Sequence, residues 1–176
     1  MIVIIKMTFL LLILTTNASA FYLVETNPFI LIGGGESITI GKELGDFRLK
    51  IGAIQSELPD FLLENDDFTV DRASYSFSID YFGKSPEWYF VGIGFSTFTD
   101  DFSIESSPNE TEITGTSMSL RLGFRYTLFS SFYIQPRMTY STYQYSEDPK
   151  IVQISSQDYE LPDMSFSSTI QIGVFF

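Results

Sequence analysis

The sequence of 176 residues contains no cysteine and no histidine. Without cysteine, disulfide bridges, thiolate catalysis and thiolate metal sites are excluded. Without histidine, the serine–histidine and cysteine–histidine forms of nucleophilic catalysis are excluded as well. No GxSxG-type nucleophile motif and no EF-hand spacing of acidic residues is found. We therefore expect no enzyme activity, no cofactor and no defined metal site.

Basic residues and long apolar runs are also scarce. The chain has 10 Lys and Arg residues against 22 Asp and Glu residues, a formal net charge of −12. Such an acidic protein repels phosphates, so a nucleic-acid partner is not expected. Beyond residue 20, no run reaches the 18 consecutive apolar residues that a membrane helix requires.

Residues 1–20 have the pattern of a signal peptide. Lys6 supplies a positive charge, residues 7–14 are almost wholly apolar, and Ala18-Ser19-Ala20 is an A-x-A cleavage site. The apolar run is shorter than the roughly 20 residues of a membrane span. The sequence predicts cleavage after Ala20, which leaves residues 21–176 as one domain with nine basic and 22 acidic residues and a net charge of −13.

The feature that is abundant is strict alternation of apolar and polar residues, the pattern of a β-strand with two different faces. In residues 117–128, Met118, Leu120, Leu122 and Phe124 fall on one face. Arg121, Gly123 and Arg125 fall on the other. The same alternation predicts strands at residues 36–43, 47–57, 73–83, 88–100, 112–128, 132–146 and 164–176.

The predicted connections alternate between short ones, at about residues 44–46, 83–88 and 128–131, and long ones, at about 58–72, 101–111 and 147–163. This alternation is typical of bacterial outer-membrane barrels, which have even strand numbers. The eighth strand must then lie within residues 21–33, and we place it at Pro28–Ile32. The alternative is one long kinked strand over residues 28–43, with its kink at Gly33-Gly34-Gly35.

The polar face distinguishes a membrane barrel from a water-soluble one. Charged and amide side chains occupy it, and these would be costly to bury in a dry core. Aromatic residues also cluster beside the short turns, where membrane barrels carry interfacial girdles. These are Phe82, Trp88, Tyr89, Tyr126, Phe129, Phe132 and Tyr133. The predicted fold is all-β, an eight-stranded antiparallel up-and-down transmembrane β-barrel in the outer membrane.

The final strand ends in Ile172-Gly173-Val174-Phe175-Phe176, which resembles the C-terminal strand of bacterial outer-membrane proteins. With the loop pattern and the length, the chain resembles the OmpA/OmpX/OmpW-type small barrels. That resemblance implies outer-membrane lipid and lipopolysaccharide as surroundings and recognition of the strand ending in Phe176 by the barrel-assembly machinery. It also implies a monomer with a structural, adhesive or solute-passage role. The related membrane enzymes depend on histidine, which this chain lacks.

Candidate functional residues fall in two groups. The first is a set of charged residues on the polar face, Arg48, Lys50, Asp80, Arg121, Arg125 and Arg137. Asp80 is the only acid placed in mid-strand, so Glu36, Glu43 or Glu57 would complete an ion network that closes the lumen. An eight-stranded barrel is just wide enough for side chains to fill it. The alternative is a narrow channel for small anionic solutes.

The second group is acidic and is predicted to lie in the long loops. It includes Asp60, Glu64, Asp66, Asp67, Asp100 and Asp101. Clustered carboxylates could attract divalent cations, but solvated charge that keeps the loops soluble explains them as well.

Overall fold

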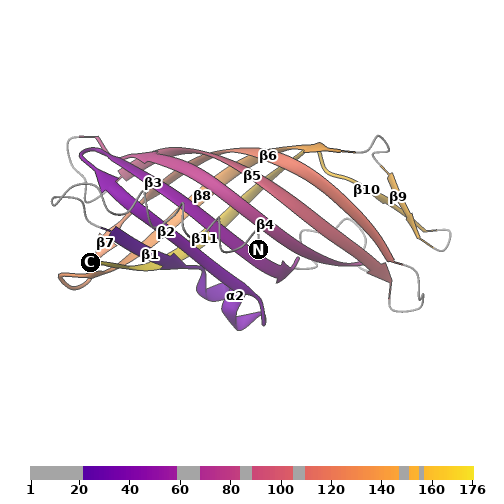
Figure 1. Cartoon of the computed structure of the whole chain (residues 1–176), viewed down its shortest axis with the longest axis horizontal. Coiled ribbons are helices and arrows are strands. Elements are labelled where there is room, and N and C mark those ends of the chain that lie inside the picture. Colours follow the sequence, from indigo (N-terminus) through magenta and orange to yellow (C-terminus); the bar gives the residue numbers. More distant parts are fainter. Residues whose placement is uncertain (1–21, 59–67, 84–88, 105–109, 147–150, 155–156) are drawn as a thin grey trace, which may run out of the picture.

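The computed structural model describes residues 22–58, 68–83, 89–104, 110–146, 151–154 and 157–176. Eight antiparallel strands follow one another around a ring, and the last pairs with the first (Figure 1). They are β1 (Tyr22–Thr26), β2 (Glu36–Leu44), β3 (Phe47–Glu57), β4 (Phe68–Tyr81), β5 (Tyr89–Ile104), β6 (Glu110–Phe124), β8 (Phe132–Tyr145) and β11 (Met164–Phe175). This is the up-and-down barrel that the alternation predicted.

The two ends of the ring differ. The chain's C-terminus and the short connections lie at one end, here called the turn end (Figure 1). Two of these connections place a glycine at positive φ, Gly45 at 62° and Gly83 at 67°. The other end, here called the loop end, carries a second small sheet of β9 (Ile151–Ile154) and β10 (Gln157–Glu160). At the turn end, the two-residue strand β7 (Tyr126–Thr127) pairs with β8.

The alternation separates an apolar outer surface from a polar interior. Met118, Leu120, Leu122 and Phe124 of β6 are exposed on the outside, whereas Arg121, between them, is buried inside. Other strands repeat this arrangement, so large apolar side chains encircle the ring. A water-soluble barrel has the opposite arrangement, and an apolar outer band is what lipid requires.

The eighth strand lies within residues 21–33 and a strand covers residues 36–43, as predicted. The placement of the eighth strand at Pro28–Ile32 was wrong, and so was the alternative of one kinked strand over residues 28–43. The first strand, β1, lies earlier at Tyr22–Thr26, and Pro28–Ile32 forms the short helix α2. Asn27 caps this helix, since its side-chain oxygen accepts a hydrogen bond from the Phe29 amide at 3.1 Å. Pro28 occupies the first turn, where its missing N–H costs nothing. The local capping signal therefore prevails over the apolar run that suggested a strand.

The described residues of the predicted long connections contain more β-structure than expected. β5 continues to Ile104, four residues beyond its predicted end, and β6 begins two residues before its predicted start. Asp100, predicted both as the last residue of a strand and as a loop acid, and Asp101, predicted in the loop, therefore lie within β5. Within the predicted 147–163 loop, β9 and β10 form a hairpin. Its Val152, Ile154 and Tyr159 pack against the inward side chains of the long strands. The buried cluster at the loop end comprises Phe68, Val70, Phe102, Ile104, Ile113, Val152, Ile154, Tyr159 and Leu161. The apolar character of these segments thus reflects burial at the barrel end.

Candidate functional site

Arg48 lies at the centre of the charged cluster inside the turn end. Its side chain is fully buried, and its guanidinium contacts Glu25 at 3.1 Å and Glu43 at 2.5 Å. It also donates a hydrogen bond to Gln135 Oε1 at 2.8 Å. The ring of Phe82 lies 4.5 Å from the guanidinium carbon, which adds a cation–π contact. Four groups from separate strands or turns thus hold one buried cation.

Asp80 forms the second centre of this cluster. Its carboxylate is fully buried and lies 2.7 Å from Lys50 Nζ and 2.9 Å from Arg121 Nη2. Lys50 also contacts Glu25 at 3.2 Å, which links the two centres into one network. Gly92 of β5 faces this carboxylate, and any Cβ at that position would collide with it. The glycine is therefore explained by the close approach of Asp80 to the neighbouring strand.

Glu25 is the network member that the sequence analysis missed. It is buried on β1, bonds Arg48 and Lys50, and accepts a hydrogen bond from the Tyr133 hydroxyl at 2.8 Å. It was missed because the first strand was placed at residues 28–32. The alternation of Leu23, Glu25 and Asn27 against Tyr22, Val24 and Thr26 was the signal that could have located it.

The other predicted members have different positions. Arg125 contacts Glu43 at 2.5 Å, so Glu43 bridges two arginines. Arg137 was expected to pair with a carboxylate, and that expectation was wrong for the residues that the structure describes. It donates from Nε to Thr169 Oγ1 at 3.0 Å, and its side chain is only half-buried. Glu36 and Glu57 do not enter the network, because they lie on the outer surface.

A separate ion pair lies nearer the loop end. Arg72 and Asp100 form two parallel hydrogen bonds of 2.6 Å each, the geometry of a strong guanidinium–carboxylate pair. Asp100 is thus a second inward-facing mid-strand acid, and the prediction of a solvated loop position for it was wrong. Asp101 is exposed on the outer face of the same strand. The predicted loop acids Asp60, Glu64, Asp66 and Asp67 lie outside the described residues, as does the signal peptide.

The aromatic residues beside the short turns separate into two sets. Phe82 and Tyr133 point inward and pack beneath the Arg48 and Arg125 guanidiniums. Tyr89, Tyr126 and Phe129 are exposed on the outside, as an interfacial girdle requires. Trp88 lies outside the described residues.

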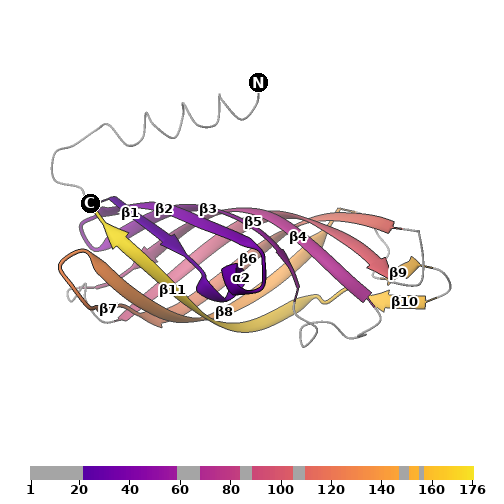
Figure 2. The ribbon, with the colours of Figure 1, turned by 90° about the horizontal axis from the view of Figure 1, so that it is seen from below.

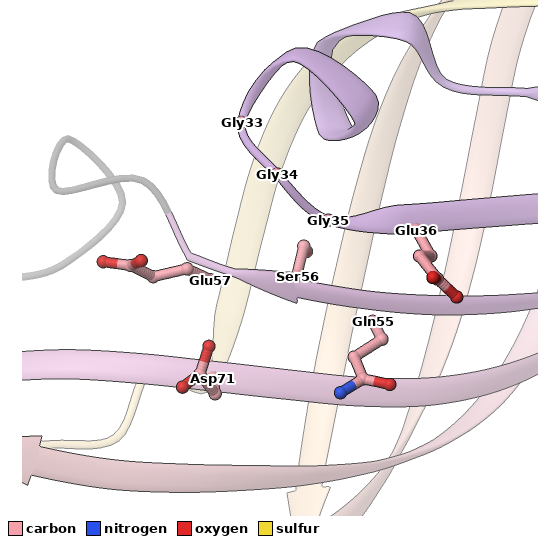
Figure 3. Close-up of a pocket in the computed structure, with 8 residues that line it drawn as sticks. All are labelled: Gly33, Gly34, Gly35, Glu36, Gln55, Ser56, Glu57 and Asp71. Carbon is pink, nitrogen blue, oxygen red and sulfur yellow. The ribbon is translucent and has the colours of Figure 1, made fainter.

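An outer pocket of about 290 Å³ lies where the glycine turn after α2 meets the ends of β3 and β4 (Figure 3). Glu36, Glu57 and Asp71 line it together with Gln55 and Ser56. Among the described residues, no three acidic side chains are close enough to hold a metal ion. The described part of the chain also contains no helix that is both long and apolar enough to span a membrane.

Comparison with solved structures identifies the fold. No family model matches the sequence, and no curated protein matches it. Among solved structures, a major outer membrane protein from Thermus thermophilus aligns with a TM-score of 0.51 at 14% identity, over 90% of this chain and all of that one. The N-terminal β-barrel domain of Pseudomonas aeruginosa OprF aligns with a TM-score of 0.50 at 10% identity, over 89% of this chain and 97% of that one. Neisserial surface protein A aligns with a TM-score of 0.43 at 12% identity, over 89% and 91%.

These alignments cover the ring almost completely, and the outer apolar band supplies independent evidence for membrane insertion. The chain therefore has the fold of the small outer-membrane β-barrels, and its apolar surface is that of an outer-membrane protein.

Proposed function

We propose that this protein is a non-enzymatic outer-membrane barrel with a structural or surface-interaction role, whose lumen is closed to ion flow. The observation that carries the proposal is that each end of the interior is filled by a different kind of packing. The turn end holds the buried ion network of Glu25, Arg48, Lys50 and Asp80. The loop end holds the apolar cluster beneath the β9–β10 hairpin.

The two fillings oppose ion passage for different reasons. Each buried charge at the turn end already has a partner at hydrogen-bond distance, so a passing ion would have to break these contacts. At the loop end, the cluster consists mainly of aliphatic and aromatic side chains, which replace the water around an ion poorly. An axial path would have to cross both fillings.

The interior charge also favours a second candidate, a narrow channel for small anionic solutes. The charged cluster at the turn end contains five basic side chains, those of Arg48, Lys50, Arg121, Arg125 and Arg137. It contains three acidic ones, those of Glu25, Glu43 and Asp80. The surplus of two positive charges would favour anions over cations in any open path.

Planar-bilayer recording separates the two functions. We expect the refolded wild-type protein to give no steady conductance, while a general porin in the same bilayer serves as the positive control. The channel hypothesis requires steady, anion-selective current that falls in Arg121→Gln and Arg137→Gln. Such a current would overturn the closed-lumen proposal.

A further inference from the structure

The ring of strands is interrupted on one side. β1 has only five residues, whereas a membrane-spanning strand takes about 9–11. It pairs with β11 only from Ile172 onward and with β2 only from Thr39 onward. Between Met164–Gln171 of β11 and Glu36–Ile38 of β2, the described part of the chain contains no pairing strand. We call this interruption the seam.

The seam has an unpaired strand edge. Antiparallel pairing alternates, and β11 uses every second residue to bond β8. The remaining backbone groups, those of Phe166, Ser168 and Ile170, therefore point toward the seam. None of them forms a backbone hydrogen bond with α2 or β2 among the described residues. Such an edge is unfavourable in hydrocarbon unless something polar reaches it.

Helix α2 covers the seam from outside. It lies at mid-length on the outer side of the ring, away from both ends (Figure 1 and Figure 2), and contacts both β11 and β2. Phe29, Leu31 and Ile32 are 60%, 49% and 83% exposed, as side chains that face lipid would be. The amides of Gly33 and Gly35 bond back to helix carbonyls at 3.0 and 2.9 Å. Because its hydrogen bonds are internal, α2 can move without breaking a strand ladder.

The lumen directly behind the seam is polar and positively charged. Ser165, Ser167 and Thr169 of β11 point inward there. Arg137 hydrogen-bonds Thr169, and it is the one interior basic residue with no carboxylate partner among the described residues. It is also more exposed than the other four basic side chains of the cluster. An anionic group at Arg137 would offset the interior surplus of positive charge.

The outer rim of the seam is mostly apolar, with Ser168 and Glu36 as its exposed polar residues. Met164, Phe166 and Ile38 are exposed there beside the apolar side chains of α2. A cation inside and an apolar rim outside match a molecule with an anionic head and an acyl chain. We propose that the seam is a lateral portal, with α2 as its lid, through which the carboxylate or phosphate head of a membrane amphiphile binds Arg137 while its chain stays in lipid.

The first test measures binding of laurate and of dodecyl phosphate by calorimetry, with the protein refolded in a neutral detergent. We expect at least one of them to bind, and the two probes separate a fatty-acid head from a phosphate head. Arg137→Gln should weaken binding by about tenfold or more, because a charge-assisted hydrogen bond is lost. Arg137→Lys keeps the charge and should retain most of the affinity. Heat-modifiable gel migration shows that each variant is folded.

Further probes make the binding test specific. A lauroyl glycerol, which has the same chain and a neutral head, should not bind. Inorganic phosphate should bind far more weakly than dodecyl phosphate. No binding to the wild type, or equal binding to Arg137→Gln, would overturn the proposal. Equal binding of inorganic phosphate would overturn the part that concerns the acyl chain.

The second test concerns the lid. The chain has no native cysteine, so Leu31→Cys with Ser168→Cys introduces a unique pair across the seam. Cross-linking this pair with a short bis-maleimide should abolish amphiphile binding, whereas each single-cysteine variant treated alike should still bind. Full binding by the cross-linked protein would show that the ligand does not enter past α2. Neither test measures conductance. The result for the lateral portal is therefore independent of the result for the closed lumen.

Discussion

Removal of the Asp80 carboxylate is the sharpest test of the interior network. In Asp80→Ala, Lys50 keeps one carboxylate partner, Glu25 at 3.2 Å, and loses its closer contact of 2.7 Å. Arg121 loses its only carboxylate partner among the described residues and keeps the Ile93 carbonyl at 3.0 Å. One substitution thus leaves two buried cations undercompensated.

The expected cost follows from burial. Asp80 is fully buried, and Lys50 and Arg121 are 2% and 8% exposed, so water can solvate the stranded cations only poorly. Breaking a buried ion pair by removing one partner costs about 3–5 kcal/mol. Because Lys50 and Arg121 each keep one contact, we expect the loss in the free energy of unfolding to lie near the lower end of that range.

The assay is equilibrium unfolding by urea in lipid vesicles, followed by the fluorescence of the single tryptophan and by gel migration. Asp101→Ala is the matched control, because this aspartate is exposed on the outer face of β5 and belongs to no described ion pair. At high salt, where the repulsion of Asp101 by Asp71 and Glu112 is screened, we expect the control to leave the free energy of unfolding nearly unchanged.

A double variant completes the test. Asp80→Ala with Arg121→Met removes one stranded cation and should recover part of the lost stability. A cost for Asp80→Ala below about 1 kcal/mol, the range of an exposed pair, would mean that water reaches the network. The argument for a closed turn end would then fail.

Three further predictions concern the outer face of the barrel and its interior. Leu122→Arg places a charge on the lipid-facing side of β6 and should lower the free energy of unfolding in vesicles by about 2–4 kcal/mol. Leu122→Met should change that free energy little. Equal stability of the two variants would refute the assignment of Leu122 to the lipid-facing side. Tyr133→Phe keeps the ring but removes the hydrogen bond to Glu25, so it should cost about 1.5–3 kcal/mol, and an unchanged urea midpoint would contradict that bond. Asp101 lies directly opposite Asp71 and Glu112 on the outer face, so like charges repel one another there. Asp101→Asn should therefore raise the free energy of unfolding at low salt but not at high salt, where the repulsion is screened. A rise that persists at high salt would show that charge repulsion is not its cause.

The alternation of residue types was sufficient to predict the ring and the facing of its strands. A period of two places every second side chain on one face, so Leu122 and Arg121 had to point in opposite directions whatever the partner strand. Arg48, Lys50, Asp80 and Arg121 were therefore identified as inward-facing from the sequence. Their partners were not, because register between distant strands depends on the closed ring.

Local signals also have limits where the alternation stops. The segment around Pro28–Ile32 is apolar and short, and such a run does not distinguish a strand from a helix. Asn27 followed by Pro28 was the capping signal, and it shows why β1 ends early and leaves the seam. Likewise, the apolar residues at the loop ends of β4 and β5, such as Phe68 and Phe102, gave no indication that the β9–β10 hairpin would pack against them.

The sequence by itself determined the strand pattern, the inside and outside of the barrel and the excess of interior basic residues, because each depends only on neighbours along the chain. The tertiary structure decided which carboxylate meets which cation. Glu25 and Arg48 are 23 residues apart in sequence yet 3.1 Å apart in space. It also decided that Arg137 faces Thr169 and, within the described part of the chain, no carboxylate, because only the pairing of β11 with β8 brings Arg137 and Thr169 together.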